Sequence, residues 1–162
     1  MTGIRKPIAL CLAAVLGAGA ALAEDLPKDP VAIKNGASGL CLDISQESQA
    51  EGAGIVQSEC KDGDSRLWRI EQTDNGYRIV NKNSSMCLDV RGGSRANGTP
   101  VIQATCNDTA DQLWRIAPSS SGNSLANVKS NLCLNVPNSV RRPGIAIVQW
   151  PCRTSAGQSW SW

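Results

Sequence analysis

The sequence predicts an all-β domain, closed or sandwich-like, built from three copies of one unit. Six cysteines recur with gaps that alternate between 19 and 27 residues, at Cys41, Cys60, Cys87, Cys106, Cys133 and Cys152. Three tryptophans recur 46 residues apart, at Trp68, Trp114 and Trp160. Short apolar alternations separated by turn residues recur at the same phase, and none of the segments after residue 30 has a long helical period. Because two residue types share one period, we take the repetition as the basis of the fold.

Two segments precede the repeats. Residues 1–23 begin with Arg5 and Lys6, continue with an apolar run and end in a small-x-small pattern at Ala23, which is typical of a secretory signal peptide cleaved after that residue. Residues 24–30 are a polar lead-in, and the repeats follow as residues 31–75, 76–121 and 122–162. The apolar run is short for a membrane span. We therefore expect a secreted or periplasmic protein without a membrane span.

Charge excludes one class of partner. The whole sequence has 16 basic and 14 acidic residues, and removing Arg5 and Lys6 with the signal makes the two numbers equal. A nucleic-acid-binding protein is expected to be basic, so we expect no nucleic-acid partner. The remaining chain is long enough for one domain with a real core. It has no Phe and one Tyr, so Trp must supply most aromatic core side chains.

Each repeat is expected to contain four short strands. Apolar stretches predict the first strand at residues 31–33, 77–80 and 124–128. Apolar residues at every second position predict the second strand at residues 40–44, 86–90 and 132–136, each half-buried. The pairs of Ile and Val before a glutamine predict the third strand at residues 55–57, 101–103 and 147–149, and the fourth follows at residues 68–70 and 114–116.

Turn residues lie between these strands at a constant phase. Gly52, Gly98 and Gly144 precede the third strand of each repeat, where we expect positive φ because glycine tolerates it. A loop rich in Ser, Asn, Asp and Gly separates each repeat from the next. These signals complete a pattern of about twelve strands with no helices between them.

The repetition leaves two symmetric pairings for the cysteines. We favour pairing across the 19-residue gap. Pairing across the 27-residue gap would leave Cys41 and Cys152, at opposite ends of the repeats, outside the symmetric pattern. Each bridge would contribute roughly 3 kcal/mol by the chain-entropy estimate, and an exported protein is where such bridges persist. A metal site is the rival interpretation, and the absence of His and of C-x-x-C spacing argues against it. The favoured bridges are Cys41–Cys60, Cys87–Cys106 and Cys133–Cys152.

The repeats resemble a known family. Each has C-L-D or C-L-N near its start, and two end in Q-x-W, as Gln112-Leu113-Trp114 and Gln158-Ser159-Trp160, whereas the first ends in Arg66-Leu67-Trp68. This pattern resembles the ricin B-type lectin domain (R-type, Q-x-W repeat), and the resemblance covers essentially all of the chain after the signal. It implies a β-trefoil of three pseudo-symmetric four-strand repeats around a threefold axis. It also implies carbohydrate binding.

The resemblance directs attention to one pair of positions in each repeat. If the bridged cysteines face each other across antiparallel strands, the residue two positions after the first cysteine lies opposite the residue two positions before the second, on the same face of the sheet. That geometry pairs Asp43 with Ser58, Asp89 with Ala104, and Asn135 with Trp150. In the family that the repeats resemble, an acid at the first position accepts hydrogen bonds from sugar hydroxyls, and an aromatic ring at the second stacks on the sugar.

The three repeats differ at these positions and just before the last Trp. The third keeps the aromatic residue with Asn in place of the acid, and we rank it first as a carbohydrate site. The second keeps the acid and a polar pair but has Ala104 for stacking, and the first has Arg66 and is expected to be inactive. The candidate residues are Asn135, Trp150 and Gln158 in the third repeat, Asp89, Asp111 and Gln112 in the second, and Asp43 in the first.

Several recurring residues are more simply structural. Trp68, Trp114, Trp160 and Trp162 are expected in the core. Gln57, Gln103 and Gln149 share one phase, which indicates a common structural hydrogen bond. The acids Asp43 and Asp89 have the alternative role of capping a local turn. Trp150 has no counterpart in the other repeats, so we expect it to be exposed, and Arg141-Arg142 is expected to be a solvated loop pair.

No catalytic constellation stands out. The sequence has no His, no unpaired thiol once six cysteines are bridged and the signal is removed, and no G-x-S-x-G motif. We therefore expect a protein that is not an enzyme and needs no cofactor or metal. The first hypothesis is a weak lectin for galactose-type or related glycans. The alternative is an interaction subunit that docks a separate protein chain of a toxin or secreted complex, and a protease inhibitor is disfavoured because the loops match in length.

Overall fold

The computed structural model describes residues 26–162 and contains thirteen strands and five short 3-10 helices, with no α-helix in that range. The predicted signal peptide lies outside the described residues. The strands are β1 Val31–Ala32, β2 Lys34–Asn35, β3 Cys41–Ile44, β4 Ile55–Ser58, β5 Leu67–Thr73, β6 Gly76–Asn81, β7 Cys87–Val90, β8 Val101–Ala104, β9 Trp114–Ser119, β10 Gly122–Asn127, β11 Cys133–Asn135, β12 Val148–Trp150 and β13 Trp160–Ser161. The 3-10 helices are η1 Ser45–Glu47, η2 Asp64–Arg66, η3 Arg91–Gly93, η4 Pro137–Ser139 and η5 Ala156–Gln158.

A ring of antiparallel strands forms the body of the molecule. The ring runs β1, β5, β6, β9, β10, β13 and β2. Where one strand was predicted at residues 31–33, the structure has two on either side of Ile33, and the second extends beyond the predicted range; β1 pairs with β5 and β2 pairs with β13. Since β1 and β2 are consecutive in the chain, this division closes the ring, and it accounts for thirteen strands where about twelve were expected.

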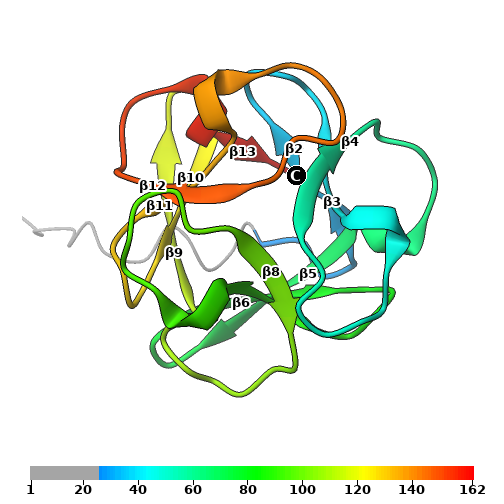
Figure 1. Ribbon diagram of the computed structural model, residues 1–162, viewed down its shortest axis with the longest axis vertical. Helices are drawn as coiled ribbons and strands as arrows, with labels where there is room; N and C mark the ends of the chain where they lie inside the picture. The colour runs from blue at the N-terminus through cyan, green and yellow to red at the C-terminus, as the bar shows by residue number, and fades with distance from the viewer. Residues whose placement is uncertain (1–25) are drawn as a thin grey trace, which may run out of the picture.

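Three hairpins extend from the ring, one in each repeat. They are β3–β4, β7–β8 and β11–β12. Isolated bridges join each hairpin to the other two, between Gly54 and Ile102, Val56 and Ala146, and Pro100 and Val148. Figure 1 shows the three parts arranged around a common centre. This arrangement is the predicted β-trefoil, and we name the parts formed by residues 31–75, 76–121 and 122–162 the first, second and third lobes.

The three recurring tryptophans form the centre of the core, as predicted. Trp68, Trp114 and Trp160 are each 0% exposed. Their indole Nε1 atoms donate to the carbonyl oxygens of Leu42, Leu88 and Leu134 at 2.9, 3.0 and 3.1 Å. Each indole therefore fills the core and satisfies its one donor. Trp162 was predicted to be in the core and is only partly buried, packed against its edge.

The favoured disulfide pairing is confirmed. Cys41–Cys60, Cys87–Cys106 and Cys133–Cys152 each span 19 residues, with Cα–Cα distances of 5.2, 5.1 and 5.0 Å. The turn glycines are confirmed as well, because Gly52, Gly98 and Gly144 have φ of +78°, +79° and +82°. The sequence period therefore fixes both the cross-links and the turns of the hairpins.

The three recurring glutamines link neighbouring lobes. Gln103 of the second lobe is 0% exposed, and its Nε2 donates to the carbonyl oxygens of Ser48 at 3.0 Å and Ala50 at 2.8 Å in the first lobe. Its Oε1 accepts from Ser84 Oγ at 2.7 Å. Gln57 and Gln149 make the same three contacts, with Val140, Arg142 and Ser38, and with Ser94, Ala96 and Ser130, respectively. The predicted shared hydrogen bond is thus a cyclic set of bonds between lobes.

Candidate functional site

The register of the hairpins differs from the prediction. In the first hairpin Cys41 lies opposite Ser58, and Asp43 lies opposite Val56. Cys60 lies beyond the last residue of β4, so the disulfide runs from a strand to the loop after its partner. The second and third hairpins have the same register, with the pairs Cys87–Ala104, Asp89–Ile102, Cys133–Trp150 and Asn135–Val148. The predicted opposed pairs were therefore wrong.

The error is a slip of two residues, and its consequence for the site is small. Side chains alternate between the two faces of a strand, so a slip of two keeps each residue on the predicted face. The predicted partners Asp43–Ser58, Asp89–Ala104 and Asn135–Trp150 become diagonal neighbours instead of opposed ones. Diagonal neighbours in a sheet remain within reach of long or aromatic side chains.

The third lobe holds an open cavity of about 540 Å³, which brings together Asn135 of β11, Trp150 of β12 and Gln158 of η5. The indole of Trp150 is 38% exposed and is the one large hydrophobic side chain classed as exposed among residues 26–162, which confirms the prediction. Sequence reasoning missed the remaining lining residues, which are Gly98, Pro137, Asn138, Ser139, Val148, Arg153 and Ser155.

Two amides of the third lobe have different roles. Gln158 is buried, its Oε1 accepts from the Arg153 backbone N–H at 2.7 Å, and its Nε2 donates to the Pro151 carbonyl at 3.0 Å. It therefore holds the loop that follows Trp150. The side-chain amide of Asn135 makes no hydrogen bond to any residue in the range 26–162. Its donors and acceptor are consequently available to a bound molecule.

The second lobe keeps the acid but has no ring. Asp89 Oδ2 accepts from Gln112 Nε2 at 2.8 Å, and Gln112 also donates to the Thr105 carbonyl at 3.0 Å. Burial raises the pKa of Asp89, the Gln112 hydrogen bond opposes that rise, and the negative charge of Asp111 adds to it. Ala104 is nearly buried and offers no stacking surface. The second lobe can therefore accept hydrogen bonds but offers no ring on which a sugar could stack.

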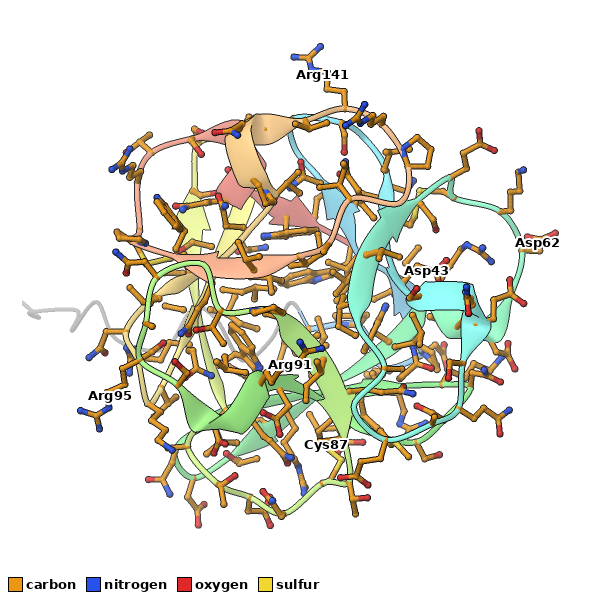
Figure 2. The ribbon with its side chains drawn as sticks, in the orientation of Figure 1. Asp43, Asp62, Cys87, Arg91, Arg95 and Arg141 are labelled. Atoms are coloured by element: carbon orange, nitrogen blue, oxygen red, sulfur yellow. A yellow bond between two sulfur atoms is a disulfide. The ribbon has the colours of Figure 1, made fainter. Side chains whose placement is uncertain are left out.

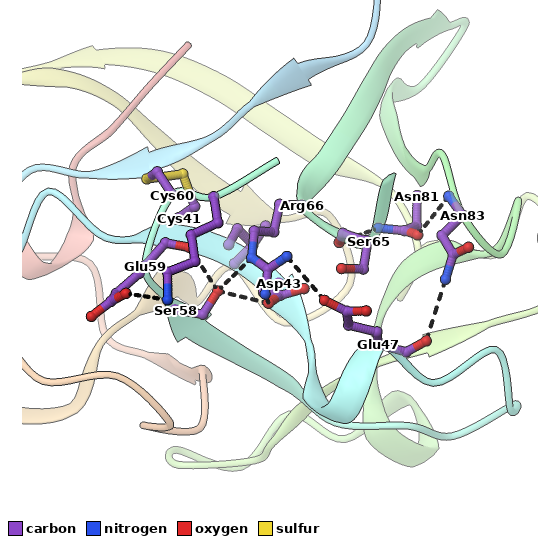
Figure 3. Close-up of polar contacts among 12 residues, drawn as sticks. Cys41, Asp43, Glu47, Ser58, Glu59, Cys60, Ser65, Arg66, Asn81 and Asn83 are labelled. Carbon is purple, nitrogen blue, oxygen red and sulfur yellow. Dashed lines mark hydrogen bonds and ion pairs between the residues drawn. A yellow bond between two sulfur atoms is a disulfide. The ribbon is translucent and has the colours of Figure 1, made fainter. Parts of the chain in front are cut away.

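The candidate polar side chains of the first lobe bond to one another beside an open cavity of about 530 Å³, and Figure 3 shows these contacts. Arg66 occupies the site: its Nη2 lies 3.0 Å from Asp43 Oδ2, its Nε donates to Ser58 Oγ at 3.1 Å, and its Nη1 donates to Glu47 Oε1 at 3.1 Å. Ser58 Oγ also donates to Asp43 Oδ2 at 2.6 Å. Asp43 thus bonds to side chains and does not cap a turn, so the capping interpretation was wrong for this residue.

A pair of left-handed residues shapes each lobe at a position that sequence reasoning missed. The pairs are Gln46 and Glu47, Gly92 and Gly93, and Asn138 and Ser139. A Cβ at Gly157 would lie 2.5 Å from Ser139 Oγ, and a Cβ at Gly93 would lie 2.9 Å from Asp111 Oδ2. In the third lobe the Ser139 side chain therefore leaves no room for a side chain at position 157, and in the second lobe Asp111 lies where a side chain at position 93 would be.

No group of three or more Cys, Asp or Glu side chains within residues 26–162 is arranged to hold a metal ion.

A family model and several solved structures match the chain. The family model for the ricin-type beta-trefoil lectin domain matches residues 29–160. No curated protein matches.

Among solved structures, the designed threefold-symmetric protein ThreeFoil is 28% identical with a TM-score of 0.77, over 80% of this chain and 94% of that one. An exo-beta-1,3-galactanase from Clostridium thermocellum is 26% identical with a TM-score of 0.79, over 83% of this chain. The hemolytic lectin CEL-III is 28% identical with a TM-score of 0.67, over 85% of this chain. The match covers only 30% of the galactanase chain and 30% of the CEL-III chain.

Proposed function

Because the chain belongs to the family of ricin-type beta-trefoil lectin domains, we propose that it is an exported lectin that binds galactose-type or related glycans weakly, chiefly through its third lobe. One observation supports this choice of lobe above the others. The exposed ring of Trp150 and the unpartnered amide of Asn135 line the same cavity of about 540 Å³. A ring supplies the stacking face, and an amide both donates to and accepts from hydroxyls.

The proposed affinity is modest for a physical reason. Only the third lobe combines a ring with free hydrogen-bonding groups, since Ser58 and Ala104 stand where the third lobe has its ring, and Arg66 bonds Asp43 and Ser58 in the first lobe. A protein with one working site gains no avidity from its own repeats. The second lobe, with Asp89, Asp111 and Gln112, is the proposed secondary site.

The proposal extends to the compartment and to catalysis. Three disulfides fit an extracellular protein, because such bridges persist in oxidising compartments. Within residues 26–162 no helix has the length and hydropathy needed to cross a membrane. The matched domain is a carbohydrate-binding, non-catalytic fold. We extend this to the chain, as a binding protein without an enzymatic activity of its own.

Replacing Trp150 with alanine is expected to weaken glycan binding about 30-fold, because truncating a central aromatic contact typically costs about 2 kcal/mol or more. The measurement is a glycan array with galactose-containing and related sugars, followed by titration of the best ligand with both proteins. Equal background signal from wild type and variant would refute the proposed function.

A variant in the first lobe serves as the matched control. Asp43→Asn is expected to leave glycan affinity unchanged, because Arg66 already occupies the space beside Asp43 and Asn retains an acceptor for Ser58. The same titration checks this, with the circular dichroism spectrum confirming that the variant is folded. A folded variant that lost binding would place the working site in the first lobe instead.

A second candidate function is the non-catalytic subunit of a toxin or another secreted complex. The occupied site in the first lobe and the missing ring in the second favour it, because a protein that docks a partner chain does not need three sugar sites. Its test is co-purification from the native source: a stable partner chain, together with no glycan binding by the isolated protein, would favour this function.

A further inference from the structure

The charge of the cavity in the third lobe distinguishes it from the other two sites. Its lining contains one charged side chain, Arg153, and no carboxylate. The site in the first lobe is lined by Asp43 and Glu47 together with Arg66, which pairs with both, and the second is built on Asp89. The third lobe is therefore the one site of the three that combines a ring with a positive charge.

No carboxylate compensates the charge of Arg153. The residues at the same position in the other lobes, 46 and 92 residues earlier, are Asn107 and Lys61. Lys61 is paired with Glu59, at a distance of 2.8 Å between Nζ and Oε2. Pro151 stands where the first lobe has Glu59, and the guanidinium of Arg153 pairs with no acid among residues 26–162. An exposed, uncompensated guanidinium beside a cavity is available to an anionic ligand.

The net charge of the whole third lobe is positive, like that of its cavity. Residues 122–162 contain no Asp or Glu, and their basic residues are Lys129, Arg141, Arg142 and Arg153. The first lobe is opposite in sign, because residues 31–75 contain eight acidic and four basic residues. In Figure 2, Asp62 of the first lobe and Arg141 of the third project from different sides of the molecule. Such an asymmetry attracts an anion to one lobe of a protein whose net charge is close to zero.

Hydrogen bonds hold the backbone between Trp150 and Arg153 in place. Gln158 bonds both the Arg153 backbone N–H and the Pro151 carbonyl, so the loop from Trp150 to Arg153 is held at two points. Trp150 and Arg153 line the same cavity, so a sugar stacked on the ring would have a guanidinium beside it for one of its substituents. A guanidinium forms paired hydrogen bonds with a carboxylate or a sulfate and has no matching acceptor for a hydroxyl's proton.

We propose that the third-lobe cavity selects acidic sugars, in which the ring stacks on Trp150 and an anionic substituent binds Arg153. This inference rests on the proposed function and names its ligand class. The probes are a galacturonic acid trisaccharide and its neutral galactose counterpart, which differ only in having a carboxylate or a hydroxymethyl group at C6 of each ring, with galactose 6-sulfate as a third probe. The sulfated probe shows whether the site requires a carboxylate or any anion.

Isothermal titration at low salt is expected to give an affinity at least about tenfold higher for the acidic trisaccharide than for the neutral one. Arg153→Gln should abolish that preference, because it weakens the binding of the acidic trisaccharide more than that of the neutral one. Added salt should weaken the binding of the acidic sugar more than that of the neutral one. Trp150→Ala should weaken both. Arg141→Gln is the control, because it removes the same charge from the same lobe at a side chain that points away from the molecule.

The outcomes separate the two proposals. Equal affinity for acidic and neutral sugars in the wild type would overturn the selectivity for acidic sugars and leave the lectin function intact. Loss of preference in Arg141→Gln equal to that in Arg153→Gln would also overturn it, since the contact would then be unspecific. Binding of none of the three probes would overturn both. Arg153→Lys, which keeps the charge, should retain part of the preference and thereby separate loss of charge from misfolding.

Discussion

Replacing Trp114 with alanine is expected to lower the free energy of unfolding by about 3 to 5 kcal/mol. The indole is 0% exposed at the centre of the core, where its two counterparts from the other lobes are equally buried. Its removal leaves a large cavity and also deprives the Leu88 carbonyl of the Nε1 donor at 3.0 Å. The measurement is chemical denaturation with the disulfides intact, extrapolated linearly to water.

Trp150→Ala provides a control with the same change of side chain. Trp150 is 38% exposed, lines a cavity and does not belong to the core cluster, so its truncation leaves the core contacts intact. We expect a loss below about 1 kcal/mol, as for surface substitutions in general. The two variants thus separate the structural tryptophan from the binding one. Comparable losses in both would show that the ring of Trp150 also supports the fold.

The fold could be predicted because buried positions repeat. The cysteines, the three core tryptophans and the three glutamines each recur every 46 residues, and each type has one structural role in all lobes. Because the shared core requires the same residue type at the same place in each lobe, that residue type recurs three times in the sequence. Trp150 could be identified by the inverse argument, because a tryptophan without counterparts is not needed by a threefold core.

The register of the hairpins could not be predicted from the same pattern. The spacing of Cys41 and Cys60 shows that they are bridged but not where β4 ends, and β4 ends at Ser58. The assumption that bridged cysteines lie opposite each other therefore displaced the pairing by two residues. The candidate residues remained on the predicted face only because side chains alternate with a period of two.

The prediction that the first lobe is inactive rests on part of the contacts that the structure shows. The sequence shows that Arg66 replaces the glutamine of the other lobes and therefore predicts an inactive site. It does not show that the guanidinium folds back onto Asp43, Ser58 and Glu47, because that depends on where the backbone places all four side chains. Arg153 was missed for a related reason: its counterparts are a paired lysine and a neutral asparagine, so no repetition marks it.

Gln103→Leu is expected to lower the free energy of unfolding by about 3 kcal/mol, although it removes no apolar contact. The amide is 0% exposed, and its loss leaves the carbonyls of Ser48 and Ala50 and the hydroxyl of Ser84 without their partner. Each buried polar group left unsatisfied costs about 1 to 3 kcal/mol, and water reaching the partly buried carbonyls reduces the total. Denaturation under the conditions used for Trp114→Ala measures the effect.

Gln72→Leu is the matched control, since Gln72 is an exposed residue of β5, and we expect a change within about 0.5 kcal/mol.

The number of unfolding transitions of Gln103→Leu shows whether the three lobes still unfold together. Because Gln103 bonds the second lobe to the first, its loss weakens a contact between lobes, but the shared core and the remaining glutamines still join them. One transition, coincident by fluorescence and circular dichroism, is therefore expected. Separate transitions would mean that the glutamines, and not the tryptophan core, make the three lobes fold as a unit.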